Sequence, residues 1–271
     1  MSVGDRRARF RALHAGERLF VMPNPWDVGS ARLLASCGFE ALATTSAGLA
    51  WSLGKLDQSV SRHELVAHVA TVAAATPLPL NVDSERCYPD DPGGVAETVA
   101  LLADAGAAGF TVEDYDPATH AIDDVEAAAE RIATAAEAAH RLPDPLVLTG
   151  RAENHIRGVD DLEDTIARLI AYRDAGADVV YAPGLADLDQ IRAVVDAVGV
   201  PVNVLALASG PPVPELAAVG VRRVSTGGSL AGSAYGALLV GAQELLAEGT
   251  SGYAAAGLSA EALEAAFGSG S

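Results

Sequence analysis

Hydrophobic positions along the chain gather in eight short runs that are mostly apolar or β-branched and show no polar alternation. Strands of that kind are buried on both faces, as in a parallel sheet covered by helices. Longer alanine-rich segments typical of helices separate the runs. The pattern therefore predicts alternating strands and helices, with strands at residues 19–23, 41–46, 78–83, 109–114, 146–151, 178–183, 201–206 and 222–227.

Glycine marks the end of most predicted helices, in phrases such as LLADAGAAG and YRDAGAD. Its left-handed conformation caps a helix and turns the chain into the next strand. Eight such units in about 250 residues predict a single (β/α)8 TIM barrel over residues 1–271, with an extra N-terminal helix. A doubly wound sheet is the alternative, but no G-x-G-x-x-G motif follows the first strand. A short terminal helix is expected around AEALEAAF, followed by a frayed Ser/Gly tail.

The charge balance limits which partners the chain can have. The formal net charge is −18, the isoelectric point is about 4.5, and Lys55 is the only lysine. No basic face is available for phosphate groups, so we expect neither nucleic acid nor a membrane as partner. The N-terminal segment is charged and amphipathic, and we expect no apolar run of about 18 residues after it. Because the two cysteines, Cys37 and Cys87, form no pattern, the sequence predicts a soluble cytoplasmic protein.

Acidic side chains follow neighbouring strands at the points where the strands end. Asp83 and Glu85 follow one strand, and Glu113 ends the next. The carboxyl ends of barrel strands build the active site, so these acids should meet at one mouth. They would repel one another unless a cation lay among them. We therefore predict a metal site of Asp83, Glu85 and Glu113, which as an all-oxygen set favours Mg²⁺ or Mn²⁺ over Zn²⁺. The alternative is that each acid caps a helix or forms an ion pair on the rim.

Two further features at strand ends suit an anionic ligand. Arg151 ends its strand, and its guanidinium could grip a substrate carboxylate or serve as a structural ion-pair partner. The phrase TTSAG could be a simple turn. Alternatively, the backbone N–H groups and hydroxyls around Thr45, Ser46 and Ala47 could cradle an anion.

The order of motifs along the chain is distinctive. Over almost its entire length the chain resembles the isocitrate lyase/phosphoenolpyruvate mutase superfamily, in the motifs NPWDVGSAR, TTSAGLAWSLGKLD, VDSERCYPD, VEDYD, GRAEN, YAPGL, PVNVLA and GVRRVSTGG. The resemblance implies a TIM barrel whose C-terminal helix is exchanged between subunits of a homotetramer or dimer. The terminal segment AEALEAAF could make that exchange.

The resemblance also implies roles for individual residues. Asp83 and Glu85 would take the two acidic places of the family's metal loop, and Glu113 would join them as metal ligand and catalytic residue. Arg151 matches the arginine that grips the substrate and takes part in catalysis. Asp57 matches a catalytic acid after the strand-two loop. That loop, with Thr45, Ser46 and Ala47, would bind substrate together with Asn203.

The function that the resemblance implies is a Mg²⁺-dependent lyase that cleaves a C–C bond in a small 2-hydroxy or 2-oxo di- or tricarboxylate through an enolate. The lid segment DYDPATHAID departs from the family pattern, because it lacks the lysine and cysteine that the family's lyases carry there. Asp57, His120 or Tyr88 could then serve as the base. The rival functions are a C–P bond mutase or phosphonopyruvate hydrolase, an oxaloacetate hydrolase, and a catalytically silent barrel that binds a metabolite.

Overall fold

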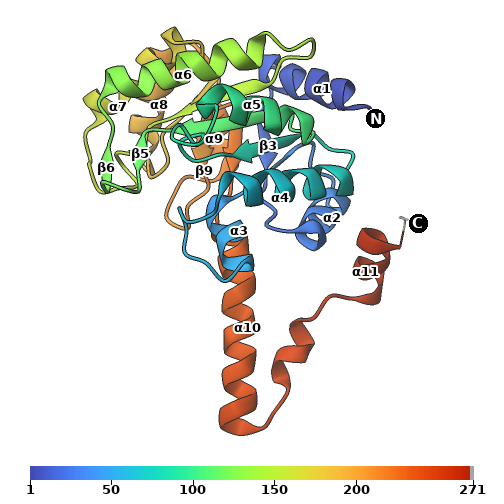
Figure 1. Ribbon diagram of the computed structural model, residues 1–271. Coiled ribbons are helices and arrows are strands. Elements are labelled where there is room, and N and C mark those ends of the chain that lie inside the picture. Colours follow the sequence, from blue (N-terminus) through green and yellow to red (C-terminus); the bar gives the residue numbers. More distant parts are fainter. Residues whose placement is uncertain (269–271) are drawn as a thin grey trace.

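Eight parallel strands form the centre of the molecule in a computed structural model that describes residues 1–268 (Figure 1). Their order around the sheet is β1-β10-β9-β8-β7-β4-β3-β2. The two ends of this order, β1 and β2, meet where the Ala43 amide donates to the Pro23 carbonyl at 3.1 Å. The sheet is therefore a nearly closed, TIM-barrel-like (β/α)8 barrel, as predicted. Its strands are β1 (Phe20–Met22), β2 (Leu42–Ala43), β3 (Leu80–Asp83), β4 (Gly109–Glu113), β7 (Val147–Arg151), β8 (Val179–Tyr181), β9 (Val202–Leu205) and β10 (Arg223–Ser225).

Helices surround the strands (Figure 1). The extra N-terminal helix closes the amino end of the barrel, where the rings of Phe10 and His14 lie edge-on to Phe20 of β1. The helices are α1 (Val3–Ala15), α2 (Val28–Ser36), α3 (Ser46–Ser52), α4 (Arg62–Ala75), α5 (Gly94–Asp104), α6 (Val125–His140), α7 (Leu162–Asp174), α8 (Leu188–Val198), α9 (Val213–Ala218), α10 (Ser229–Glu248), the 3-10 helix η1 (Gly252–Ala256) and α11 (Ala260–Phe267). The tail that the sequence predicts as frayed lies largely outside the described residues.

The barrel interior changes from apolar to polar along the strands. Near the amino ends it is filled by Phe20, Ala41, Ala108, Val147 and Val179. Toward the carboxyl ends a small cavity opens among polar side chains, which include Asn81, Thr111, Asn203, Ser225 and Arg223. Because buried polar groups need partners, this end of the barrel is the place to look for a ligand.

Two segments differ from the expected strands. The second strand is shorter than 41–46, because Thr45 caps α3 by accepting a hydrogen bond from the Gly48 amide. After β4, the chain forms an unexpected antiparallel hairpin of β5 (Tyr115–Asp116) and β6 (Ala121–Ile122). Both segments lie beside the barrel mouth, so these local differences shape the site.

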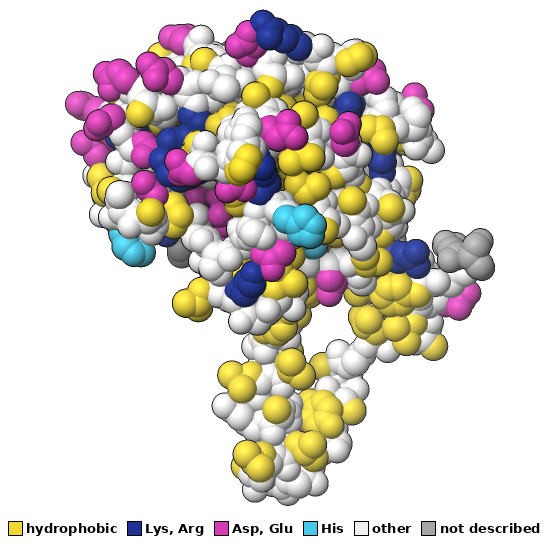
Figure 2. Space-filling view, in the orientation of Figure 1, with side chains coloured by type: hydrophobic (Ala, Val, Ile, Leu, Met, Phe, Trp, Pro, Cys, Tyr) yellow, Lys and Arg dark blue, Asp and Glu magenta, His cyan; other side chains and the backbone are white. Residues whose placement is uncertain are grey.

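The C-terminal arm, α10 to α11, extends away from the barrel and returns (Figure 1). At its return α11 packs against α2 of the same chain, so exchange between subunits is not shown. Apolar side chains cover much of the arm (Figure 2), and those of α10 include Leu238, Leu239, Val240, Leu245 and Leu246. Contrary to expectation, α10 is long and apolar enough by composition to cross a membrane, a criterion that core helices of soluble proteins also meet.

Candidate active site

Three charged side chains from neighbouring strands meet at the carboxyl end of the barrel. β4 and β7 pair in a register that sets Glu113 opposite Arg151, and β3 lies on the other side of β4. The Arg151 Nη1 atom lies 3.5 Å from Asp83 Oδ1 and 3.4 Å from Glu113 Oε2. Its Nε donates to Glu153 Oε1 at 2.5 Å. The structure thus brings Asp83, Glu113 and Arg151 together, and Glu153 joins them.

Asp114, the residue after Glu113, supports the site from behind. Its Oδ1 accepts from the Glu153 amide at 2.8 Å, and its Oδ2 accepts from the Tyr172 hydroxyl at 2.6 Å. Arg168 pairs with the same carboxylate at 3.1 Å. Burial raises the pKa of Asp114, while these bonds oppose the rise. Because Tyr172 and Arg168 lie on α7 and Glu153 lies in the loop after β7, Asp114 fixes that loop and α7 relative to β4.

Burial shifts the acids at the mouth toward their protonated forms. Only 2% of Glu113 and 8% of Glu85 is exposed. Burial, with the charges of Asp83 and Asp57 adding to it, raises the pKa of Glu85 to about 8. Burial also raises the pKa of Glu113 well above its usual range, against the opposing charge of Arg151. A nearby cation would reverse these shifts, because it favours the charged carboxylates.

The oxygen atoms at the mouth suit a hard divalent cation. Asp83 Oδ1 and Gln58 Oε1 are buried without a hydrogen-bond partner. Within residues 1–268, no three His, Cys, Asp or Glu side chains stand close enough to enclose a metal by themselves. Mg²⁺ needs no such cage, because one or two carboxylates commonly hold it while water and substrate complete the shell. The residues present therefore fit Mg²⁺, and the metal-binding roles of Asp83, Glu85 and Glu113 stay predictions.

The loop after β3 holds Glu85 in a strained backbone conformation. Glu85, Cys87 and Tyr88 have φ angles of 51°, 63° and 49°, in the left-handed region that non-glycine residues seldom adopt. The Glu85 carbonyl accepts from the Glu113 amide at 2.9 Å, and the Ser84 carbonyl accepts from the Cys87 amide at 2.8 Å. Strain of this kind persists only where surrounding contacts over-determine the conformation. These contacts hold the backbone of Glu85 against that of Glu113.

The predicted anion cradle forms the start of α3. The Ser46 amide donates to Asp83 Oδ2 at 3.1 Å, and the Thr45 hydroxyl caps the helix. Both groups are thus engaged within the protein, and Ala47 follows in the first turn. This segment orients Asp83, and its predicted contact with substrate is untested.

Asp57 and Gln58 approach the site from the loop between α3 and α4. Asp57 is exposed to solvent on one side. Its pKa is nevertheless raised, mainly by desolvation against the surrounding protein atoms and secondly by the charge of Asp83. Gln58, which sequence reasoning missed, donates from Nε2 to Glu113 Oε1 at 2.9 Å. It adopts a φ of 64°. No sequence signal distinguishes this glutamine from an ordinary loop residue, because its contact is with a residue 55 positions away.

A buried polar chain below the mouth includes a second arginine that sequence reasoning missed. Arg223 donates from Nε to Asn203 Oδ1 at 2.9 Å and from Nη2 to Thr149 Oγ1 at 3.0 Å. Asn203 in turn donates to Ser225 Oγ at 2.9 Å. Both ends of the Asn203 amide are thus engaged within the protein, and its predicted role in binding substrate is untested. Burial lowers the pKa of Arg223 to about 9, and this guanidinium forms no ion pair with a described carboxylate.

Tyr181 joins this chain to the mouth. It lines the same small cavity as Asp83 and Arg151, and the Arg151 guanidinium lies 5.4 Å from its ring centroid. A side-chain hydrogen bond with Ser225 and the charge of Arg151 lower the pKa of Tyr181, but burial outweighs both and raises it to about 12. Tyr181 therefore stays protonated at neutral pH and can act as a proton donor. In the sequence it reads as a core aromatic residue at the end of a buried strand.

The buried contact between His14 and Arg223 at the barrel floor should make the free energy of unfolding depend on pH. His14 accepts from Arg223 at 3.1 Å, and burial, followed by the charge of Arg223, lowers the pKa of His14 to about 3. The unfolded chain binds this proton below about pH 6.5 and the folded chain does not, so stability falls as the pH drops from 6.5 toward 3. We expect the stability advantage of the native chain over His14→Gln to be about 2 kcal/mol smaller at pH 5 than at pH 7. Urea unfolding at both pH values measures this, and a difference that does not change with pH would contradict it.

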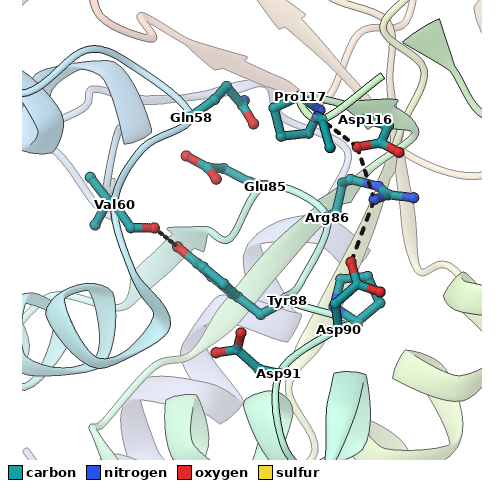
Figure 3. A pocket seen from close by; sticks show the side chains of 11 residues that line it. Gln58, Val60, Glu85, Arg86, Tyr88, Asp90, Asp91, Asp116 and Pro117 are labelled. Atoms are coloured by element: carbon teal, nitrogen blue, oxygen red, sulfur yellow. Dashed lines mark hydrogen bonds and ion pairs between the residues drawn. The ribbon is translucent and has the colours of Figure 1, made fainter. Parts of the chain in front are cut away.

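The other residues considered as bases already have partners. The Tyr88 hydroxyl donates to the Val60 carbonyl at 3.1 Å (Figure 3), and burial raises its pKa above the usual range. His120 lies exposed at the turn of the β5–β6 hairpin, with Nδ1 3.2 Å from the Tyr115 hydroxyl. Asp57 lies close enough to the mouth for the charge of Asp83 to raise its pKa and the charge of Arg151 to lower it.

Comparison with known proteins assigns the family. Residues 10–246 match the family model described as phosphoenolpyruvate phosphomutase. The chain belongs to the phosphoenolpyruvate mutase/isocitrate lyase superfamily. It is similar to a probable 2-methylisocitrate lyase 2 of Corynebacterium glutamicum, with 31% identity over 71% of this chain and 64% of that protein. It is also similar to an oxaloacetate decarboxylase of Paraburkholderia xenovorans, with 34% identity over 72% of this chain and 67% of that protein.

Solved structures of the superfamily show the same fold. A lyase/mutase candidate from Burkholderia cenocepacia J2315 is 50% identical, with a TM-score of 0.91 over 96% of this chain and 95% of that one. Oxaloacetate acetylhydrolase in complex with oxalate is 27% identical, with a TM-score of 0.86 over 97% of this chain and 94% of that one. Phosphonopyruvate hydrolase, solved with oxalate and Mg²⁺, shares the fold at 23% identity, with a TM-score of 0.83 over 97% and 95%. The relatives thus include a named lyase and a named acetylhydrolase, and the phosphonopyruvate hydrolase that shares the fold was solved with Mg²⁺.

Proposed function

We propose that this protein is a Mg²⁺-dependent lyase that cleaves a C–C bond in a small 2-hydroxy or 2-oxo dicarboxylate or tricarboxylate through an enolate. The observation that carries the proposal is the meeting of Asp83 and Glu113 around Arg151, where Asp83 Oδ1 is buried near the guanidinium but accepts no hydrogen bond. Asp83, Glu85 and Glu113 would hold the cation. When bound, it would supply Lewis-acid stabilisation of the negative charge that develops next to the substrate carboxylate.

The chain's own residues would position the substrate and move its protons. Arg151 supplies a fixed positive charge for a substrate carboxylate, because Glu153 holds its Nε side. Asp57 takes the proton of the 2-hydroxyl group, a role that its raised pKa favours. The C–C bond then breaks, and its electron pair forms the enolate. The hydroxyl of Tyr181 gives its proton to the enolate carbon, which leaves a phenolate that water reprotonates.

This role of Tyr181 predicts a loss of turnover without a loss of binding. We expect Tyr181→Phe to lower kcat by roughly 100-fold or more, because proton transfer by a positioned group contributes about 10² to 10⁴. The affinity for oxalate with Mg²⁺ should stay unchanged, because the phenyl ring remains beneath Arg151. Steady-state kinetics and calorimetry measure the two quantities. A variant with native kcat would remove Tyr181 from the mechanism.

A second candidate function is cleavage of oxaloacetate. It is supported by the relative named oxaloacetate decarboxylase and by the similarity to oxaloacetate acetylhydrolase. The same acids and the same arginine would serve, because this reaction also develops charge next to a carboxylate.

A substrate panel separates these functions from their rivals. The purified protein with Mg²⁺ would be given 2-methylisocitrate, an alkylated malate, oxaloacetate and phosphonopyruvate, while 2-oxo acid release, oxaloacetate consumption and phosphorus NMR are followed. We expect release of a 2-oxo acid from a carboxylate substrate, abolished by EDTA. Conversion of phosphonopyruvate alone would establish C–P chemistry instead. Turnover of none, with no binding of oxalate, would indicate a silent barrel.

We also propose that the C-terminal arm makes a homotetramer or dimer. Its exposed leucines form an apolar surface of the kind that marks protein contacts, and Leu246 is 90% exposed. Light scattering of the native protein should give an oligomer, and Leu246→Asp should shift it toward the monomer. Leu56→Asp is the matched control, because Leu56 is 81% exposed but lies outside the arm. A monomeric native protein would contradict the proposal.

A further inference from the structure

A second cavity, of about 210 Å³, lies beside the mouth (Figure 3). The loop after α3 contributes Gln58 and Val60, the loop after β3 contributes residues 85, 86 and 88–91, and the β5–β6 hairpin contributes residues 116–118. Three separate segments therefore enclose it. Of its lining residues, the mechanism proposed above uses only Glu85.

The cavity adjoins the proposed reaction centre at Gln58 and Glu85. Gln58 lines the cavity and donates to Glu113 at 2.9 Å. Glu85 lines it too, and its carbonyl accepts from the Glu113 amide at 2.9 Å. A substituent on a substrate held at Asp83 and Arg151 can therefore extend past these two side chains into the cavity.

Much of the cavity wall is apolar. The side chains of Val60, Tyr88, Pro89, Pro117 and Ala118 line it. The Tyr88 hydroxyl is occupied by the Val60 carbonyl, so the ring presents hydrocarbon (Figure 3). This wall suits alkyl groups, whose burial is favourable.

The polar part of the wall disfavours an anion. Among the described residues that line the cavity, Arg86 is the only cation, and its guanidinium pairs with Asp116 at 3.3 Å and Asp123 at 3.1 Å. Asp90 lies 4.0 Å from it, and Asp91 pairs with Arg62. Acids thus outnumber the lining cation, and of the three guanidinium nitrogens of Arg86 the buried Nε alone lacks a partner among the described residues. A carboxylate that entered would meet like charges, which selects against such ligands.

We infer that this cavity is a specificity pocket for an uncharged, largely alkyl substituent of the substrate. The inference rests on the proposed function and narrows it: the substrate is an alkylated 2-hydroxy or 2-oxo diacid rather than a tricarboxylate. The two carboxylates of the diacid belong at the mouth with Arg151, and the alkyl group belongs among Val60, Tyr88 and Pro117.

Competition against oxalate tests the pocket. Oxalate would be bound with Mg²⁺, then displaced by malate, by malates with methyl, ethyl and propyl groups at C2 or C3, and by isocitrate as the tricarboxylate. We expect at least one alkylmalate to bind roughly tenfold more tightly than the analogue with one carbon fewer, in line with discrimination in apolar enzyme pockets. Isocitrate should bind more weakly than malate. Isocitrate binding as tightly as the best alkylmalate would overturn the inference.

Two neighbouring residues of the hairpin turn provide a matched pair of variants. Ala118 lines the cavity, and Thr119 does not, yet both are exposed and should tolerate substitution. Ala118→Trp fills the cavity and should abolish the gain in binding affinity that alkyl groups give. The affinities for oxalate and malate should stay within about twofold of those of the native protein. Thr119→Trp should keep the gain. An alkyl preference that persists in Ala118→Trp would refute the pocket.

A third variant tests the charge argument. Asp116→Asn removes one partner of Arg86 and should strengthen isocitrate binding relative to malate by roughly fivefold or more. An unchanged ratio would show that charge in this cavity does not select the ligand. If oxalate fails to bind the native protein with Mg²⁺, the proposed function itself fails. If oxalate binds normally but alkyl groups bring no gain in affinity, the specificity pocket is refuted and the proposed function stands.

Discussion

Replacing Asp83 by asparagine should weaken Mg²⁺-dependent binding of oxalate by roughly 100-fold or more and remove turnover, because loss of groups that merely support metal ligands already costs about 10- to 100-fold. Asp83 Oδ1 is buried without a hydrogen-bond partner, and its Oδ2 is held by the Ser46 amide. Asparagine keeps the shape but removes the charge. Titration calorimetry with Mg²⁺ present and absent measures the effect directly.

The control for Asp83→Asn is the same charge change far from the mouth. Asp189 is exposed on the first turn of α8 and contacts only Arg192, at 3.5 Å, among the described ion pairs. Asp189→Asn should leave metal and oxalate binding unchanged. Equal affinities in the native protein and Asp83→Asn would remove Asp83 from the metal site.

Replacing Arg151 by lysine should lower kcat/KM by roughly 100-fold or more, because breaking a buried, hydrogen-bonded charge pair costs about 2–5 kcal/mol. The guanidinium reaches Asp83, Glu113 and Glu153 at once. Lysine keeps the charge but cannot reproduce the planar fork. Initial rates on the substrate found in the panel measure the loss, and circular dichroism confirms that the variant is folded.

Arg157 offers a matched arginine for that experiment. It pairs with the same Glu153, through Oε2 at 3.0 Å, and its guanidinium stacks on Tyr115 at 3.5 Å from the ring centroid. Arg157→Lys should cost less than about tenfold, because this side chain is partly exposed and exposed pairs contribute little. Equal losses in the two variants would indicate a structural role for Arg151 rather than a role in binding substrate.

The barrel and the meeting of the acids could be predicted from the sequence for a physical reason. Unbroken apolar runs between glycine-capped helices favour a parallel sheet, and parallel strands bring their carboxyl ends to one mouth. Asp83, Glu113 and Arg151 end adjacent strands, so their proximity follows from strand order. The position of Glu85 could not be predicted in the same way. It depends on a left-handed backbone conformation, which a sequence without glycine at that position does not indicate.

Other parts of the site could not be read from the sequence, because they depend on contacts between distant segments. Gln58 reaches Glu113 only once two loops have folded together. Arg223 begins a strand that the sequence predicts as buried, but its partner could not be predicted, because the guanidinium is buried against His14, 209 positions away. The β5–β6 hairpin forms one wall of the second cavity. Its own residues are largely acidic and polar, a composition that indicates only a loop.

The most direct test of the central claim is a crystal soaked with Mn²⁺ and oxalate, with anomalous diffraction used to locate the ion. The account predicts an anomalous peak within about 2.5 Å of an Asp83 carboxylate oxygen, with Glu85 and Glu113 binding it directly or through water and oxalate beside it. It also predicts Arg151 at the oxalate. A peak elsewhere, or oxalate bound at the same place without any metal, would contradict the account.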